Sequence, residues 1–287
     1  MITTQLATYP VSHTIPTIPR TFQPAVTRRI DGSNDLRRLL NRFEPITLAE
    51  MDAVALLDRT DTKYVMRTDQ LYTALAGVST DYRVLQIDGV RLHPYETLYF
   101  DTDDFAMYMR HHAGRRVRFK VRSRQYVASQ RAFMEVKVKT RRDRTNKRRI
   151  ETAGLMTQLT PDASSFVAGQ VPLDAAALRP RLWNDFVRVT LVSKHEPERL
   201  TLDLDLSFSY GRRYAELPGV AIAEVKQEGI NRGSAFVRQM RAMAIPSTGF
   251  SKYCIGTALL YPQLKHNNFK GKLRLVEKLM GDDNNVH

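Results

Sequence analysis

The sequence predicts an α+β fold, an antiparallel β-barrel with helices packed outside it. The chain has 287 residues, of which 43% are apolar, and this is enough for one sizeable core. Several segments alternate apolar and charged residues at every second position, which is the period of a strand with one buried face. Helix-capping residues occur before and between these segments, so short helices are expected around the sheet.

The clearest alternation lies in residues 117–126, where four basic side chains share one face of the predicted strand and apolar side chains share the other. The four are Arg118, Lys120, Arg122 and Arg124. The pattern recurs in residues 132–140, 200–207 and 221–228. There the polar positions are Glu135, Lys137, Lys139, Thr201, Asp203, Asp205, Glu224, Lys226 and Glu228. A helical reading would scatter these charges around the cylinder, so strands are favoured.

One such strand could simply belong to a sheet with a solvated charged face. Like charges two residues apart on a strand lie about 6.6 Å apart and repel by about 2.5 kcal/mol at an effective dielectric of about 20. A row of four cations is therefore costly unless it is solvated, paired with carboxylates or facing a bound polyanion. We infer a closed or nearly closed barrel whose polar face lines the lumen and whose apolar outer face is covered by helices.

The remaining elements follow from local signals. Residues 1–30 are rich in Thr and Pro and predict a flexible leader, residues 31–262 a single domain, and residues 263–287 a C-terminal helix and tail. Thr47 and Glu50 form a capping box before one helix, and Thr68 is the expected N-cap of the next. Helices are expected over 35–42, 48–57, 69–76, 104–112, within 155–179, over 234–243 and after 270. Strands are expected over 82–87, 95–100, 117–126, 132–140, 148–151, 186–193, 200–207 and 221–227.

The charge of the chain indicates an anionic partner. The formal net charge is +14, and residues 115–149 hold fifteen Lys or Arg against only Glu135 and Asp143. Specific nucleic-acid binding is disfavoured, because this segment carries only three aromatic side chains for base stacking. The chain has no P-loop motif, which excludes that class of ATPases and kinases. The single cysteine, Cys254, the missing secretory signal and the absence of a long apolar run predict a cytoplasmic protein without a transmembrane segment.

Six short motifs between residues 43 and 261 occur in an order that resembles VTC domains, a branch of the triphosphate tunnel metalloenzymes or CYTH superfamily. They are Asp61-Thr-Lys-Tyr64, Tyr95-Glu-Thr-Leu-Tyr-Phe-Asp-Thr102, Arg118-Phe-Lys-Val-Arg-Ser-Arg-Gln-Tyr126, Glu135-Val-Lys-Val-Lys139, Ala223-Glu-Val-Lys226 and Phe250-Ser-Lys-Tyr253. The resemblance implies a β-barrel tunnel in which basic side chains grip a triphosphate. It also implies that the γ-phosphate of ATP is added to a growing inorganic polyphosphate chain with Mn²⁺ or Mg²⁺ as cofactor.

The resemblance assigns roles position by position. Lys63, Arg122, Arg124, Lys137, Arg188 and Lys252 would contact the reacting phosphates. Lys147, Arg199, Lys226 and Ser251 would bind substrate, and Glu224 would hold the metal. Arg118 and Lys120 are added as substrate-binding residues because they share the predicted face.

Two other functions stay open, a tunnel triphosphatase or other phosphohydrolase, and a non-catalytic polyanion-binding module. Many tunnel hydrolases begin with a strand that carries two glutamates and a lysine, whereas this chain offers only Asp61 and Lys63, which favours the polymerase. If the product crosses a membrane, a separate membrane protein would have to carry it.

Single positions also have plain structural alternatives. Lys63 could be a surface lysine, Glu224 could pair with a lysine and never touch metal, and Arg188 and Arg199 could simply be exposed. Tyr95 and Tyr99 are expected to pack the barrel, with stacking of an aromatic ring on adenine as the alternative.

Overall fold

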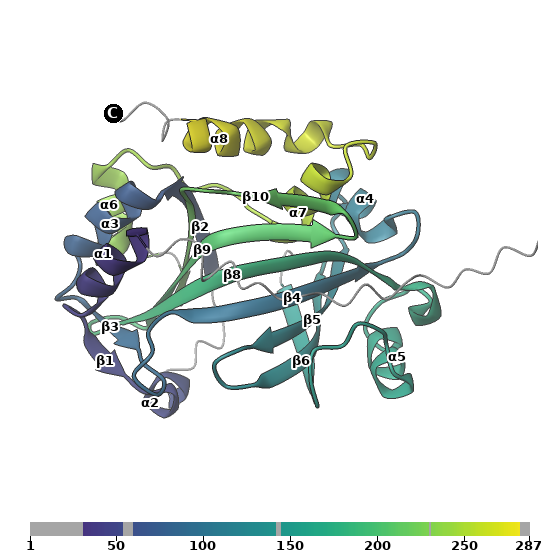
Figure 1. Ribbon diagram of the computed structural model, residues 1–287, viewed down its shortest axis with the longest axis horizontal. Coiled ribbons are helices and arrows are strands. Elements are labelled where there is room, and N and C mark those ends of the chain that lie inside the picture. The colour runs from purple at the N-terminus through teal and green to yellow at the C-terminus, as the bar shows by residue number, and fades with distance from the viewer. Residues whose placement is uncertain (1–30, 54–59, 142–144, 230, 282–287) are drawn as a thin grey trace, which may run out of the picture.

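The computed structural model describes residues 31–53, 60–141, 145–229 and 231–281, so the expected leader lies outside it. A single sheet dominates the described part (Figure 1). Its strands are β1 (Glu44–Ile46), β2 (Thr60–Arg67), β3 (Tyr82–Leu85), β4 (His93–Asp101), β5 (Arg118–Tyr126), β6 (Arg131–Lys139), β7 (Thr145–Thr152), β8 (Arg179–Ser193), β9 (Glu198–Tyr210), β10 (Arg213–Glu216) and β11 (Val220–Gln227). The main path runs β2-β11-β9-β8-β4-β5-β6-β7, and every pair along it is antiparallel.

The sheet curls strongly but its ladder stays open, because in the described part the path begins at β2 and ends at β7. Side chains from both ends, Lys63 on β2 and Lys147 on β7, nevertheless line one cavity. The chain after α6 covers part of the β2 edge, where Ser247 forms a bridge with Tyr64 and the Thr248 N–H donates to the Lys63 carbonyl at 2.8 Å. The expected nearly closed barrel is thus an open curl whose β2 edge is partly covered.

Helices gather in three places around this curl (Figure 1). They are α1 (Asp31–Leu40), α2 (Leu48–Ala53), α3 (Thr68–Ala76), α4 (Ala106–His112), α5 (Pro161–Ala168), α6 (Ala235–Ala242), α7 (Lys252–Leu260) and α8 (Lys270–Gly281), with 3-10 turns at Ala175–Ala177 and Asn267–Phe269. Helices α1, α3 and α6 bury apolar side chains against the outer face of β2, β11 and β9, and α5 covers β5 and β6. This confirms the expected helix-covered outer face.

Helix α7 departs from that expectation, because it packs against the concave face. Tyr253 on α7 contacts Tyr99 on β4, with ring centroids 5.0 Å apart, and both lie in one apolar cluster with Phe208 and Ile222. A β-bulge makes this packing possible. The β8–β9 register shifts near Asp205, whose φ of 51° turns its side chain outward. The predicted inward position of Asp205 is therefore wrong, and Leu206 and Phe208 face α7 instead.

The local predictions agree with the structure in the type of each element more than in its exact bounds. The capping box is present, since the Thr47 N–H donates to Glu50 and the Glu50 N–H donates to the Thr47 hydroxyl. The N-cap of α3 is Arg67 rather than Thr68, and Glu228 lies just beyond β11 instead of on the polar face. Strand β2 is not among the expected strands, because its first half is polar. The expected end of the helix at 48–57 lies outside the described residues.

A buried carboxylate fixes the positions of α4 and α7. Asp101, at the end of β4, accepts hydrogen bonds from the backbone N–H groups of Met107 and Tyr108, both at 2.9 Å, and from the Tyr253 hydroxyl. The N–H and the hydroxyl of Thr102 also donate to it, so five hydrogen bonds offset part of the cost of burying this carboxyl. Asp101 thereby ties both helices to the strand that carries Tyr99 into the lumen.

Candidate active site

The concave face of the sheet encloses a cavity of about 540 Å³. Twelve Lys or Arg side chains line it, against four Asp or Glu side chains among the described residues. Twelve of the thirteen predicted site residues lie here, namely Lys63, Lys120, Arg122, Arg124, Lys137, Lys147, Arg188, Arg199, Glu224, Lys226, Ser251 and Lys252. The thirteenth, Arg118, lines an adjoining cavity.

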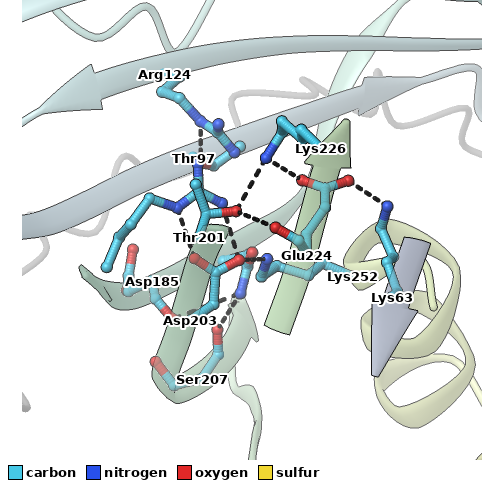
Figure 2. Close-up of polar contacts among 12 residues, drawn as sticks. Lys63, Thr97, Arg124, Asp185, Thr201, Asp203, Ser207, Glu224, Lys226 and Lys252 are labelled. Atoms are coloured by element: carbon cyan, nitrogen blue, oxygen red, sulfur yellow. Dashed lines mark hydrogen bonds and ion pairs between the residues drawn. The ribbon is translucent and has the colours of Figure 1, made fainter. Parts of the chain in front are cut away.

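Three carboxylates organise six of these twelve cations, and each bridges two of them. Figure 2 shows two of the three bridges, centred on Asp203 and Glu224. On β9, Asp203 accepts a two-pronged contact from Arg188 on β8, at 2.6 and 2.8 Å, and a further one from Lys252 at the start of α7. Asp203 is only 3% exposed, and the paired cations hold the pKa of its carboxyl well below the ordinary range despite burial.

The second bridge lies between β11 and β2, at the β2 end of the sheet. Glu224 on β11 contacts Lys63 on β2 through one oxygen and Lys226 through the other, the latter at 2.7 Å. Lys226 also donates to the Thr201 hydroxyl at 2.9 Å. Burial would raise the pKa of Glu224, but Lys226 and Lys63 hold it well below its usual value. Lys63 therefore points into the lumen rather than lying on the outer surface.

The third bridge lies on the opposite side of the curl. Glu135 on β6 accepts from Arg122 on β5 at 2.7 Å and also pairs with Lys147 on β7. The Glu135 side chain is only 1% exposed, whereas Arg122 and Lys147 remain accessible from the cavity. The carboxylate thus lies behind its two cations, which leaves guanidinium and ammonium groups facing the lumen.

Other predicted residues are held by neutral partners. Lys120 donates to the Ser251 hydroxyl at 2.8 Å, and this hydroxyl also caps α7 by accepting from the Cys254 N–H. Arg124 donates to the Thr97 hydroxyl at 3.1 Å. These contacts orient a cation without neutralising it, so the charge stays available to an anion.

Burial, together with neighbouring cations, lowers the pKa of several lumen lysines. Lys137 is accessible to water inside the cavity but surrounded by protein. This enclosure, and next the Lys120 ammonium, lower the pKa of Lys137 to about 8. The pKa of Lys120 is also lowered, with burial as the main cause. Burial and the nearby positive charges thus both disfavour protonation of these lysines, which a bound anion would reverse.

Two tyrosines line the cavity, although the sequence predicts barrel packing for them in the first place. Tyr99 accepts a hydrogen bond from Arg122 at 3.3 Å, and Tyr95 lies beneath the guanidinium of Arg188, 5.0 Å from its ring centroid. Burial alone would raise the pKa of Tyr99, but surrounding cations, Arg122 foremost, hold it below its ordinary value. The alternation of Tyr95, Thr97 and Tyr99 with Leu98 was the signal that could have identified them.

The adjoining cavity has a volume of about 470 Å³ and meets the first one around Lys120, Lys137, Phe250 and Ser251, which line both. Arg118 and Lys139 continue the inward row of β5 and β6 into it. Together the two adjoining cavities form a basic passage on the inner side of the curl.

Cations that carboxylates and hydroxyls hold in place line this passage. The VTC domain model matches residues 58–261, well over half of the chain. This chain belongs to the VTC domain family. Membership supports an enzymatic activity on triphosphate or polyphosphate, and the site's composition agrees with such a substrate.

The other comparisons add little about function. No curated protein matches this VTC domain. Similar solved structures include HpAC1 from Hippeastrum, described as having a dominant triphosphatase activity, at 13% identity, 69% coverage of this chain, 96% of that chain and a TM-score of 0.44. A candidate adenylate cyclase from Vibrio parahaemolyticus has 13% identity, coverages of 69% and 97% and a TM-score of 0.40. At such identities and scores these likenesses carry no argument about mechanism.

The donor set fits a divalent metal only in a restricted way. Within the described ranges, no group of three or more His, Cys, Asp or Glu residues could hold an ion by itself. Mg²⁺ and Mn²⁺ are commonly bound by one or two carboxylates together with phosphate oxygens. Glu224 can supply one such carboxylate, once Lys63 or Lys226 shifts to a bound phosphate. No helix of the described residues is long and apolar enough to cross a membrane.

Proposed function

We propose that this VTC domain is a polyphosphate polymerase that transfers the γ-phosphate of ATP to the end of a growing inorganic polyphosphate chain. A terminal phosphate oxygen of the chain attacks the γ-phosphorus, a new phosphoanhydride bond forms, the bond to the β-phosphate breaks, and ADP leaves. The observation that carries the proposal is the passage itself. A basic lumen that continues beyond the bridged cations can hold a chain longer than the three phosphates of ATP.

The residues have separate tasks in this reaction. Arg122, Arg124 and Arg188 present planar guanidinium groups that can each clamp two phosphate oxygens, whereas lysines such as Lys252 act as movable point charges. Phosphoryl transfer needs positioning and charge neutralisation more than covalent help from the protein. Cations aimed at the transferred group therefore account for the chemistry without a serine or cysteine nucleophile.

The carboxylates would keep these cations in place before substrate arrives. Asp203 orients Arg188 and Lys252, and Glu135 orients Arg122 and Lys147, so neither set must be ordered at the moment of binding. Glu224 would hold Mn²⁺ or Mg²⁺ together with phosphate oxygens. The metal, when bound, supplies charge neutralisation on those oxygens.

The test is incubation of the purified protein with γ-labelled ATP and Mn²⁺ or Mg²⁺, with products resolved on a urea gel. A ladder of labelled chains that exopolyphosphatase removes is the expected result. Labelled free phosphate without a ladder would assign a triphosphatase, and tight polyphosphate binding without turnover would leave a binding module.

The variant that tests the metal site is Glu224→Gln, which keeps the side-chain shape and removes the negative charge. We expect loss of metal-dependent turnover, because the variant lacks the metal carboxylate. Binding of tripolyphosphate without metal should not weaken, since Lys63 and Lys226 no longer share their charge with a carboxylate. Normal turnover in this variant would remove Glu224 from the proposed metal site.

A further inference from the structure

The second cavity has a charge pattern different from that of the first. Five cations line it, and among the described residues around it none is Asp or Glu. They are Arg118, Lys120, Lys137, Lys139 and Lys272. In the first cavity carboxylates bridge six of the twelve cations, whereas no described carboxylate lines the second cavity. A concave surface of one sign focuses its field on ligands of the opposite sign.

One of these cations also leaves a buried donor unused. The Arg118 Nε lies buried without a hydrogen-bond partner among the described residues. A buried N–H of this kind costs free energy until an acceptor reaches it or the side chain turns toward one. Nearby, His111 does not add charge, because burial and next the Lys120 ammonium lower its pKa to about 3. The cavity wall thus offers fixed cations and an unsatisfied donor.

Lys272 comes from α8, which lies beyond residues 58–261 that match the VTC domain. The helix is firmly placed, since Val276 and the preceding Phe269 are buried in the same apolar cluster as Tyr253. Its ammonium lies over Gly249, 3.8 Å from the position that a Cβ on this glycine would take. The C-terminal helix therefore contributes a cation to a wall whose other cations come from β5 and β6.

We propose that this second cavity is a retention subsite for inorganic polyphosphate, and that Lys272 on α8 is part of it together with Arg118 and Lys139. The proposal rests on the proposed polymerase function, which makes polyphosphate the chain that occupies the passage. A chain of several phosphates would reach from the bridged cations past Lys120 to Lys272, whereas a triphosphate held at the bridged cations would not need the second cavity. The subsite would keep a growing chain bound between successive transfers.

The experiment compares two variants of α8, Lys272→Gln at the cavity and Lys278→Gln on the exposed side of the same helix. Both remove one positive charge. Affinities for long-chain polyphosphate and for tripolyphosphate are measured by calorimetry on the full chain, without metal or ATP. For Lys272→Gln we expect about a fivefold loss of affinity for the long chain and about twofold or less for tripolyphosphate, as for one lost ionic contact. Lys278→Gln should bind both ligands as the unaltered chain does.

Equal losses in the two variants would overturn the subsite, because only the general field of the protein would then be involved. Equal losses of affinity for long-chain polyphosphate and for tripolyphosphate in Lys272→Gln would also overturn it. If the unaltered chain makes no polyphosphate but Lys272→Gln shows the selective loss, the polymerase proposal fails and the subsite stands. If the chain polymerises and the selectivity is absent, the subsite alone fails. Repeating the comparison with an acidic peptide and with single-stranded DNA distinguishes polyphosphate from other polyanions.

Discussion

Arg122 is the residue at which binding and stability can be separated most cleanly. It pairs with Glu135, whose side chain is 1% exposed, so Arg122→Ala leaves a buried carboxylate with Lys147 as its remaining cation. We expect about 3 kcal/mol lower stability. The loss of charged hydrogen bonds should also weaken tripolyphosphate binding about 100-fold. Urea unfolding and calorimetry measure the two effects.

The control for Arg122 is the double variant Arg122→Ala, Glu135→Gln. It should recover much of the stability, because no unpaired carboxylate remains, while binding stays weak because the guanidinium is still missing. Recovery of both would mean that Arg122 serves only to neutralise Glu135.

The lowered pKa of Lys137 predicts that ligand binding is accompanied by proton uptake. With a pKa of about 8, it is partly deprotonated in the free protein at pH 8, and a bound phosphate favours the ammonium form. Tripolyphosphate should therefore bind with proton uptake at pH 8, and its affinity should fall as the pH rises above 8. Calorimetry in two buffers of different ionisation enthalpy measures the uptake.

The same lysine affects stability with a definite sign. Its folded pKa lies below the ordinary lysine value of 10.5, so between about pH 8 and 10.5 the unfolded chain binds more protons. Its contribution to stability without ligand therefore rises with pH in that window.

The variants Lys137→Gln and Lys278→Gln test the linkage to ligand binding. Lys137→Gln should remove part of the proton uptake on binding tripolyphosphate, and Lys278→Gln should leave that uptake intact. Unchanged uptake in Lys137→Gln would assign the linkage to other groups.

At this scale the sequence predicted where cations lie better than what holds them. Alternation and motif order placed Arg122 and Lys226 in the lumen because a strand fixes the side of each residue. The pairing of Asp203 with Lys252 could not be predicted, since 49 residues separate the partners and α7 had to be placed first. The same holds for Tyr99, which becomes a site residue only when Arg122 on the neighbouring strand comes beside it.

At the scale of single elements, the close packing of α7 on β9 requires glycine at position 256. A Cβ on Gly256 would lie 2.4 Å from the Phe208 ring, so this helix packs on β9 more closely than any other residue permits. Gly256→Ala should destabilise the fold by about 1–3 kcal/mol through overpacking, although alanine is the better helix former. Thermal or urea unfolding checks this.

Gly271 on α8 is the matched control, because nothing lies within 4 Å of its Cβ position. Gly271→Ala should be neutral or stabilise by up to about 1 kcal/mol. A neutral Gly256→Ala would show that Phe208 moves aside freely and that the contact between α7 and β9 is loose. Because Lys252 begins α7, a shift of this helix should also weaken ligand binding.

The elements themselves were predictable where a period extended over several residues, as in β5, β6 and β11. Prediction failed where tertiary contacts override local pattern. Strand β2 begins with Thr60, Asp61 and Thr62, which lack a strand signal and are held by the ladder to β11. The bulge at Asp205 likewise reverses the facing of β9, and no local residue signal announces it.

For the whole molecule, the free protein holds a net charge of +14 with much of it turned inward around the passage. Mutual repulsion of those cations opposes folding, and a bound polyanion relieves it while binding only the folded state. Tripolyphosphate at about 100 times its Kd should add about 2.7 kcal/mol of stability. For a domain of this size, that raises Tm by roughly 5–10 °C.

Differential scanning calorimetry tests this with sodium chloride at matched ionic strength as the reference. Chloride screens exposed charges but cannot bridge several lumen cations at once, so its shift should be much smaller. The double variant Arg122→Ala, Glu135→Gln should lose most of the tripolyphosphate shift at the same ligand concentration, because its affinity is lower while its fold is retained. Equal shifts with chloride and tripolyphosphate would mean that general screening stabilises the protein, and that the passage does not bind the polyanion as a site.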